Sequence, residues 1–125
     1  MQLIPRACLL VMAREPAVAW LNRLPGRELG EPEFDLSSAN AQPTATLIAP
    51  VGDEAELEAE LGRVWKDIFE EWLGLWCEDR LLWPQGRNFE MFADWFQIAV
   101  SPIVFDAVGE GGEASEPPKS KIIMP

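Results

Sequence analysis

The clearest pattern of apolar positions lies in the middle of the chain, over residues 53–79. Apolar residues there recur three or four positions apart, which is the period of one face of an α-helix. They are Leu57, Leu61, Val64, Ile68, Trp72 and Leu75. Three further aromatic residues widen this stripe to about half of the helix circumference, at roughly 100° per residue: Trp65, Phe69 and Trp76. The pattern predicts one long amphipathic helix over about 53–77 with its aromatic side turned inward.

Local signals mark both ends of this helix. Asp53 follows Gly52 and can accept a backbone N–H as N-cap, and Glu56 stands three residues later, where a capping box places it. Towards the other end, Gly74 weakens the last turns and Pro84 excludes further helix.

The two sides of the predicted helix each allow two interpretations. The polar side carries Glu56, Glu60, Arg63, Lys66, Asp67, Glu70 and Glu71. It is either a solvated face or a surface that binds a partner. The aromatic side either packs in the core or forms a groove that binds a ligand or a partner.

The first half of the chain predicts two strands and a short helix. Ala7–Ala13 is a short continuous apolar run, typical of a buried central strand. Pro16 suits the first position of a helix over Ala17–Leu24. Residues 27–43 are predicted to be a long irregular connection, with room for a brief edge strand over 34–36, and a loop of that length is either functional or hides an element. Thr44–Val51 is rich in β-forming residues and predicts the second strand.

The second half predicts a turn, a helix and a strand. The turn spans Glu78–Arg87. Asn88 is a suitable cap for a helix over Phe89–Phe96, in which Phe89, Phe92 and Phe96 share one face. Gln97–Val108 is predicted to be the third strand, with a bulge, bend or edge at Ser101-Pro102 because proline cannot donate a ladder hydrogen bond.

This order of elements predicts an α+β (or α/β) fold with a three- to four-stranded sheet packed by helices. The first two strands, if they pair directly, are expected to be parallel through a right-handed crossover. We expect residues 1–108 to form a single globular domain. Residues 109–125 have the composition of a flexible tail, and their apolar end, Ile122–Pro125, either docks on the domain or on a neighbour, or stays free.

Charge is concentrated on the long helix. The chain has a net charge of -11, and residues 53–79 contribute ten acidic against two basic residues, or -8. Nucleic acid and anionic membranes require basic density, so we expect neither as a partner. A basic protein partner is favoured by electrostatic steering. The short apolar run at the N-terminus is neither a signal peptide nor a membrane span, so we expect a cytoplasmic protein.

Few groups are suited to catalysis or metal binding. The chain has no histidine, which excludes Ser-His-Asp and Cys-His systems within it. Its two cysteines, Cys8 and Cys77, are too few for a disulfide framework. We expect both to be reduced and largely buried. A single disulfide between them is the alternative. The acids Glu78, Asp79, Asp94 and Asp106 match no known cation-binding loop and are interpreted as solvated. We therefore expect no cofactor, no metal and no enzymatic activity.

Arg80 and Arg87 flank the Trp83-Pro84 turn, and two roles are open to them. They either pair with Glu78, Asp79, Glu90 or Asp94 and stabilise the turn, or bind an anionic group beside Trp83. The general pattern, with the F-x-x-W-F segment 92–96, resembles small bacterial proteins, and it assigns no family.

These observations predict a small acidic non-enzymatic interaction module of a bacterial-type cytoplasm. Its partner would be a basic protein, which it would cover as an inhibitor does, or a second copy of itself. The candidate binding residues are Glu56, Glu60, Asp67, Glu70, Glu71, Arg80, Trp83 and Arg87. The alternative is a small-molecule-binding or minor enzymatic domain with an aromatic-lined pocket around Trp65, Trp72, Trp83 and Trp95.

Overall fold

The computed structural model describes residues 1–108, and the predicted tail at 109–125 lies outside the described residues. The fold mixes helices with two small antiparallel sheets, which confirms the α+β prediction. The larger sheet has the order β3-β2-β4 and consists of β2 (Ala7–Ala13), β3 (Thr44–Ile48) and β4 (Phe96–Ser101). The smaller sheet pairs β1 (Gln2–Ile4) with β5 (Val104–Asp106).

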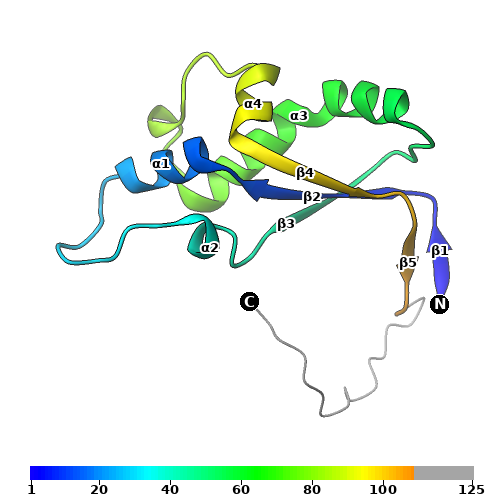
Figure 1. The fold of residues 1–125 in the computed structure, drawn as a ribbon, viewed down its shortest axis with the longest axis horizontal. Coiled ribbons are helices and arrows are strands. Elements are labelled where there is room, and N and C mark those ends of the chain that lie inside the picture. Colours follow the sequence, from blue (N-terminus) through cyan, green and yellow to red (C-terminus); the bar gives the residue numbers. More distant parts are fainter. Residues whose placement is uncertain (109–125) are drawn as a thin grey trace, which may run out of the picture.

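Strand β2 lies at the centre of the larger sheet, as its apolar run predicted. It pairs antiparallel with both neighbours. Alternate residues of β2 are buried, while Leu10 on its other face is 42% exposed. Helices α1 (Glu15–Arg23), α3 (Glu54–Trp76) and α4 (Phe89–Trp95) lie together on one side of this sheet (Figure 1). The core therefore lies between these helices and one face of the sheet.

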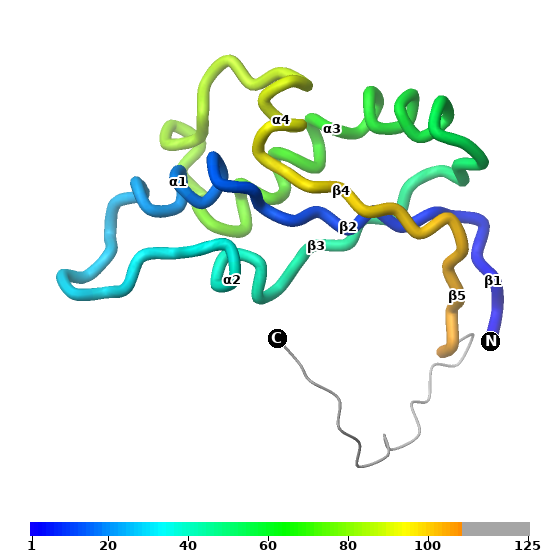
Figure 2. The backbone as a smooth tube through the Cα atoms, in the orientation of Figure 1, coloured from blue at the N-terminus to red at the C-terminus, as the bar shows by residue number. Residues whose placement is uncertain are grey.

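The prediction that the first two strands run parallel is wrong, because β2 and β3 pair directly and antiparallel. A parallel pair needs a crossover that returns along the whole strand. Helix α1 has only nine residues and begins at Glu15, so that Pro16 holds its second position rather than the first. Figure 2 shows that α1 and the following segment stay at the end of the sheet where β2 finishes. Strand β3 therefore starts at that end and runs back.

The connection at 27–43 contains an element that the sequence pattern did not predict, the one-turn helix α2 (Leu36–Ala39). The segment 34–36, which had room for a brief edge strand, contains no strand in the described structure. Asp35 and Ser38 form a capping box in place of that strand. The Asp35 carboxylate accepts a hydrogen bond from the Ser38 backbone N–H at 2.8 Å, and the Ser38 hydroxyl accepts one from the Asp35 N–H at 2.9 Å.

Two asparagine side chains fasten this connection to the rest of the domain. Asn22 donates to the carbonyl of Phe34 at 3.0 Å and accepts from its N–H at 2.8 Å. Asn40 donates to the carbonyl of Ala13 at 3.0 Å and accepts from its N–H at 2.7 Å. Each amide thus satisfies a backbone donor and acceptor as a paired strand would.

The predicted interruption at Ser101-Pro102 is confirmed. Strand β4 ends at Ser101, and the chain then leaves the larger sheet. It continues as β5 in a separate ribbon, where Phe105 lies opposite Leu3 of β1. The pattern of the first few residues did not predict β1.

The aromatic residues mainly form the core. Phe69, Phe92 and Phe96 are at most 2% exposed, and Trp72, Trp83 and Trp95 are at most 8% exposed. The prediction that Leu75 faces inward is wrong, since it is 70% exposed and Leu73 is fully buried instead. The buried stripe of α3 is centred on its aromatic residues, and Leu73 lies one turn beyond Phe69, whereas Leu75 lies at the margin of the stripe.

Candidate functional site

The first turn of α3 uses one of the predicted binding residues for capping. Asp53 accepts a hydrogen bond from the Glu56 backbone N–H at 2.8 Å, which confirms it as N-cap. The Glu56 carboxylate accepts from the N–H of Gly52 at 2.5 Å, one residue before the position that a capping box uses. Glu56 therefore contributes to the start of the helix.

Glu60 lies one turn further along α3 and pairs with Arg63. The hydrogen bond and the negative charge of Glu60 raise the pKa of the Arg63 guanidinium above its ordinary value. Glu56 and Glu60 thus interact locally at the first turns of α3, apart from the other predicted binding residues.

The segment after α3 folds back onto the end of that helix. It passes through the short 3₁₀ helix η1 (Arg80–Leu82) to Trp83. The Trp83 indole N–H donates to the carbonyl of Cys77 at 2.8 Å. A Cβ on Gly74 would lie 3.7 Å from the Trp83 ring, an ordinary van der Waals distance. The turn therefore holds the ring against the last turns of α3.

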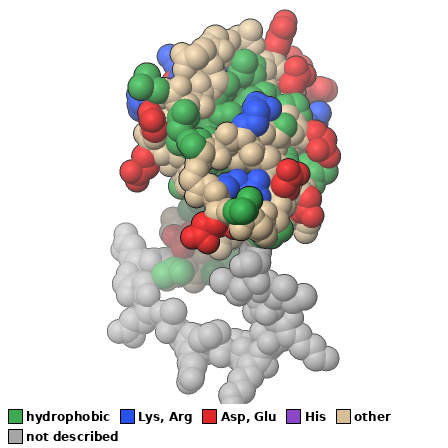
Figure 3. All heavy atoms as spheres, turned by 90° about the vertical axis from the view of Figure 1, so that its left-hand side faces the viewer, with side chains coloured by type: hydrophobic (Ala, Val, Ile, Leu, Met, Phe, Trp, Pro, Cys, Tyr) green, Lys and Arg blue, Asp and Glu red, His purple; other side chains and the backbone are tan. Residues whose placement is uncertain are grey.

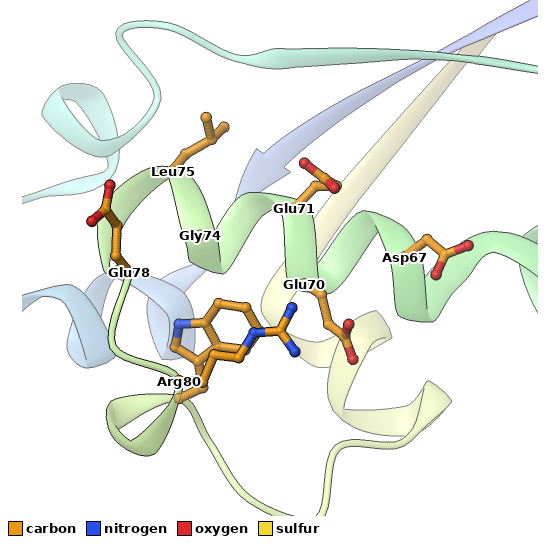
Figure 4. A pocket seen from close by; sticks show the side chains of 8 residues that line it. Asp67, Glu70, Glu71, Gly74, Leu75, Glu78 and Arg80 are labelled. Carbon is orange, nitrogen blue, oxygen red and sulfur yellow. The ribbon is translucent and has the colours of Figure 1, made fainter.

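Five of the eight predicted binding residues line one hollow of about 430 Å³, here called the Trp83 hollow. Its lining consists of Asp67, Glu70, Glu71, Gly74, Leu75, Glu78, Arg80 and Trp83. In Figure 4, Glu70 points to the same side of α3 as Arg80, whereas Glu71 and Leu75 point to the opposite side. Glu78 stands at the end of α3 and was not among the predicted binding residues. Its position seven residues after Glu71, two turns along the helical direction, is the signal that could have found it.

Both arginines of the turn lie over Trp83. The guanidinium carbons of Arg80 and Arg87 are 5.0 and 5.6 Å from the ring centroid, within the range of a cation–π interaction. Arg87 also pairs with Glu70 at 3.2 Å and donates to the carbonyl of Pro84 at 2.8 Å. Its Nε is buried without a hydrogen-bond partner among the described residues.

The predicted ion pairs of these arginines with Glu78, Asp79, Glu90 or Asp94 are wrong. Arg87 pairs with Glu70, and Arg80 forms no ion pair within residues 1–108. One reason is that the Asp79 carboxylate caps η1, where it accepts from the Leu81 N–H at 3.0 Å.

The Trp83 hollow keeps an excess of negative charge. Four carboxylates and the Arg80 guanidinium line it, and Arg87 lies over its Trp83 ring, which leaves a net charge of −2. Asp67, Glu71 and Glu78 form no hydrogen bond or ion pair with any other described residue, although the charge of Asp67 contributes to the raised pKa of Arg63. Figure 3 shows one end of the molecule, where basic side chains near the middle are flanked by acidic ones. The hollow can thus receive a cationic group.

The remaining candidate chemistry is sparse. Cys8 and Cys77 are both free thiols that form no disulfide with each other, and both are half-buried. No group of three or more cysteine, aspartate or glutamate side chains in the described part of the chain is placed to hold a metal ion. Every helix within residues 1–108 is too short or too polar to span a bilayer.

The tryptophans that suggested an aromatic pocket are packed against other rings. Trp72 and Trp95 lie 5.9 and 6.1 Å from Trp20, and Trp65 lies 6.4 Å from Phe92. Core packing accounts for these contacts, and the small-molecule alternative stays a prediction.

The chain was compared with known proteins by family, by sequence and by structure. No family model matches it, and no curated protein or solved structure does so either. The geometry of the Trp83 hollow is therefore the basis for the proposed function of the chain.

Proposed function

We propose that the protein is an acidic, non-enzymatic interaction module that binds a basic protein partner at the Trp83 hollow. The observation that carries this proposal is the group of three unpaired carboxylates, Asp67, Glu71 and Glu78, around one hollow. Covering a basic active site, as an inhibitor does, is one form of this role. A bacterial-type cytoplasm is the proposed location.

The chemistry of the hollow suits a lysine or arginine side chain. Exposed ion pairs contribute only about 0.2–1 kcal/mol each, so a single carboxylate would not make a binding site. The attractions of several carboxylates that line one hollow add together, and the chain's net charge of -11 speeds the encounter. Leu75 is 70% exposed beside them and offers apolar contact. Arg80 already lies over the Trp83 ring within the chain. An arginine of the partner would add another contact of this kind beside it.

The proposed role is binding without catalysis. The chain has no histidine, and the charged groups of the hollow without an ion pair are three carboxylates and the Arg80 guanidinium. A binding role needs only charge, shape and apolar contact, all of which the hollow has.

Affinity capture with charge-reversal variants tests the proposal. The immobilised full chain should retain one dominant basic protein from a lysate of its source cell at low salt and release it at high salt, because exposed charges are screened. The double variant Asp67→Lys, Glu71→Lys should lose that protein.

The matched control is Glu28→Lys, Glu33→Lys, which makes the same change in net charge on the exposed connection far along the chain. It should retain the partner. Equal loss in both variants would show that only the overall charge matters and would contradict a site at the Trp83 hollow. Retention of no protein at either salt concentration would contradict the proposal as a whole.

A further inference from the structure

Helix α3 extends its apolar surface past the edge of the sheet. Strand β3 is the last strand on one side of the order β3-β2-β4. Within residues 1–108 its backbone has no hydrogen-bond partner other than β2. Beyond it, Leu75 is 70% exposed and Trp76 is 38% exposed, although both belong to the apolar stripe. An open strand edge thus lies beside uncovered apolar side chains.

Two hollows of about 390 and 420 Å³ lie along this edge. They share Thr44, Trp72 and Leu75 and therefore adjoin. We call the two together the β3 groove. One wall is formed by Thr44, Ala45 and Thr46 of β3, and the other by Trp72, Leu75 and Trp76 of α3, with Glu71 beside Leu75.

A groove beside an open strand edge suits an extended peptide. Unpaired N–H and C=O groups of an edge strand accept another strand, and alternate side chains of that strand enter the neighbouring pockets. A strand added to β3 would lie against Trp72 and Leu75 on the helix side of the sheet. It would cover the apolar surface that the three-stranded sheet is too narrow to reach.

We propose that the β3 groove binds an extended apolar peptide and that its occupant is the chain's own C-terminal segment, residues 121–125. This segment reads Lys-Ile-Ile-Met-Pro, and adjacent β-branched isoleucines favour a strand. Two of the three lysines of the chain, Lys119 and Lys121, immediately precede the isoleucines. Glu71, which lines the groove, has the complementary charge.

The intervening chain is long enough to reach the groove. Residues 109–120 number 12 and span up to about 40 Å when extended. A domain of this size has a radius of gyration of about 13 Å, so the extended segment spans about three times that length and can reach a large part of the surface. A short tether also holds the local concentration of the segment at roughly millimolar.

A second copy is the less suitable occupant. Direct pairing of β3 with β3 of another molecule would bring two Glu71 side chains together. It would also join two chains with a net charge of -11 each. Like charges at an interface oppose association, whereas the C-terminal segment brings lysine.

Hydrogen exchange of the full-length protein tests this inference. The double variant Ile122→Asp, Ile123→Asp should raise the exchange rates of the outward-facing amides in 44–48 at least tenfold. The control variant Leu29→Asp, Ile103→Asp makes the same change at two exposed apolar positions off the groove and should leave those rates unchanged. A synthetic peptide of residues 117–125, added to the Ile122→Asp, Ile123→Asp variant, should restore the slow rates, and a scrambled peptide should not.

Three results would overturn the inference. Equal exchange at 44–48 in wild type and both variants would show that the segment does not cover β3. Restoration by the scrambled peptide would remove the sequence preference. Slow exchange that is lost on dilution, together with a mass of twice the chain by light scattering, would assign the groove to a second copy. The outcome is independent of the basic partner, because the readout requires no partner.

Discussion

The two flanks of α3 carry the same kind of residue, yet the rest of the chain covers them very differently. On the flank towards α4, the ring of Phe69 lies 6.0, 5.4 and 5.3 Å from those of Phe92, Trp95 and Phe96. On the flank towards β3, Trp72 is buried, but the next apolar residue, Leu75, is 70% exposed. One flank is therefore core and the other is a groove.

A helical period therefore shows which surface of a helix is apolar, but it does not show how much of that surface is covered. The sequence between α4 and β4 is continuous, so Phe92, Trp95 and Phe96 arrive together and close over Phe69. Strand β3 has no described neighbour on its outer side, so the stripe of α3 extends beyond it. Coverage depends on neighbours that are distant in sequence, which the period of α3 does not contain.

Truncation of one residue on each flank should separate core from groove by several kcal/mol. Phe69→Ala removes a fully buried ring and should reduce the free energy of unfolding by about 3–5 kcal/mol. Leu75→Ala on the open flank removes a side chain that is 70% exposed in the described structure and should change this free energy by about 1 kcal/mol or less. Urea unfolding followed by circular dichroism measures both. Similar losses for the two variants would contradict the contrast between core and groove.

The elements predicted correctly from the sequence are those with local causes. The apolar run of β2, the Asp53 cap of α3 and the Pro102 break each depend on residues within a few positions. The antiparallel pairing of β2 with β3 was not predictable in this way. It depends on where the segment after α1 turns. Asn22 bonds to the backbone of Phe34, 12 residues away, and Asn40 bonds to the backbone of Ala13, 27 residues away.

The candidate site was predictable to a similar extent. Charge on one helix face selected Asp67, Glu70 and Glu71, and the turn brought Arg80 to them. Glu56 and Glu60 have the same charge and helical phase but lie at the other end of α3, where they cap and pair locally. Charge alone therefore could not separate the residues of the hollow from those of the first turns.

The position of β3 depends on Asn40, which holds the connection at 27–43 to the end of β2. Asn40→Ala leaves the part-buried N–H and C=O of Ala13 without their partner and should cost about 1–3 kcal/mol. Urea unfolding measures the loss. Hydrogen exchange should accelerate at the Ala13 amide and along α2, whose Ser38 and Ala39 also line the β3 groove, more than in α4.

The control is Gln42→Ala, which removes an exposed amide two residues away and should leave stability within about 0.5 kcal/mol of wild type. If both variants behaved alike, the connection at 27–43 would not be fastened by Asn40, and the position of β3 would need another cause.

The two flanks should also differ slightly in how their stability depends on pH, because the helices on them have different caps. Asp35 caps α2 on the β3 flank, and Asn88 caps α4 on the other. Hydrogen bonds from the backbone N–H and then the hydroxyl of Ser38 hold the pKa of Asp35 below its ordinary value. Asn88 does not titrate.

A carboxylate with a lowered pKa in the folded state stabilises the fold fully above its ordinary pKa of about 3.9, and this contribution is lost as pH falls through the lowered value. Exchange at the Ser38 amide, corrected for its intrinsic pH dependence, should therefore rise below about pH 4 while that of the Met91 amide does not. Asp35→Asn keeps a capping oxygen without the titration, so it should abolish the rise and leave α2 capped. A rise that persists in this variant would assign the acid sensitivity of the β3 flank to another carboxylate.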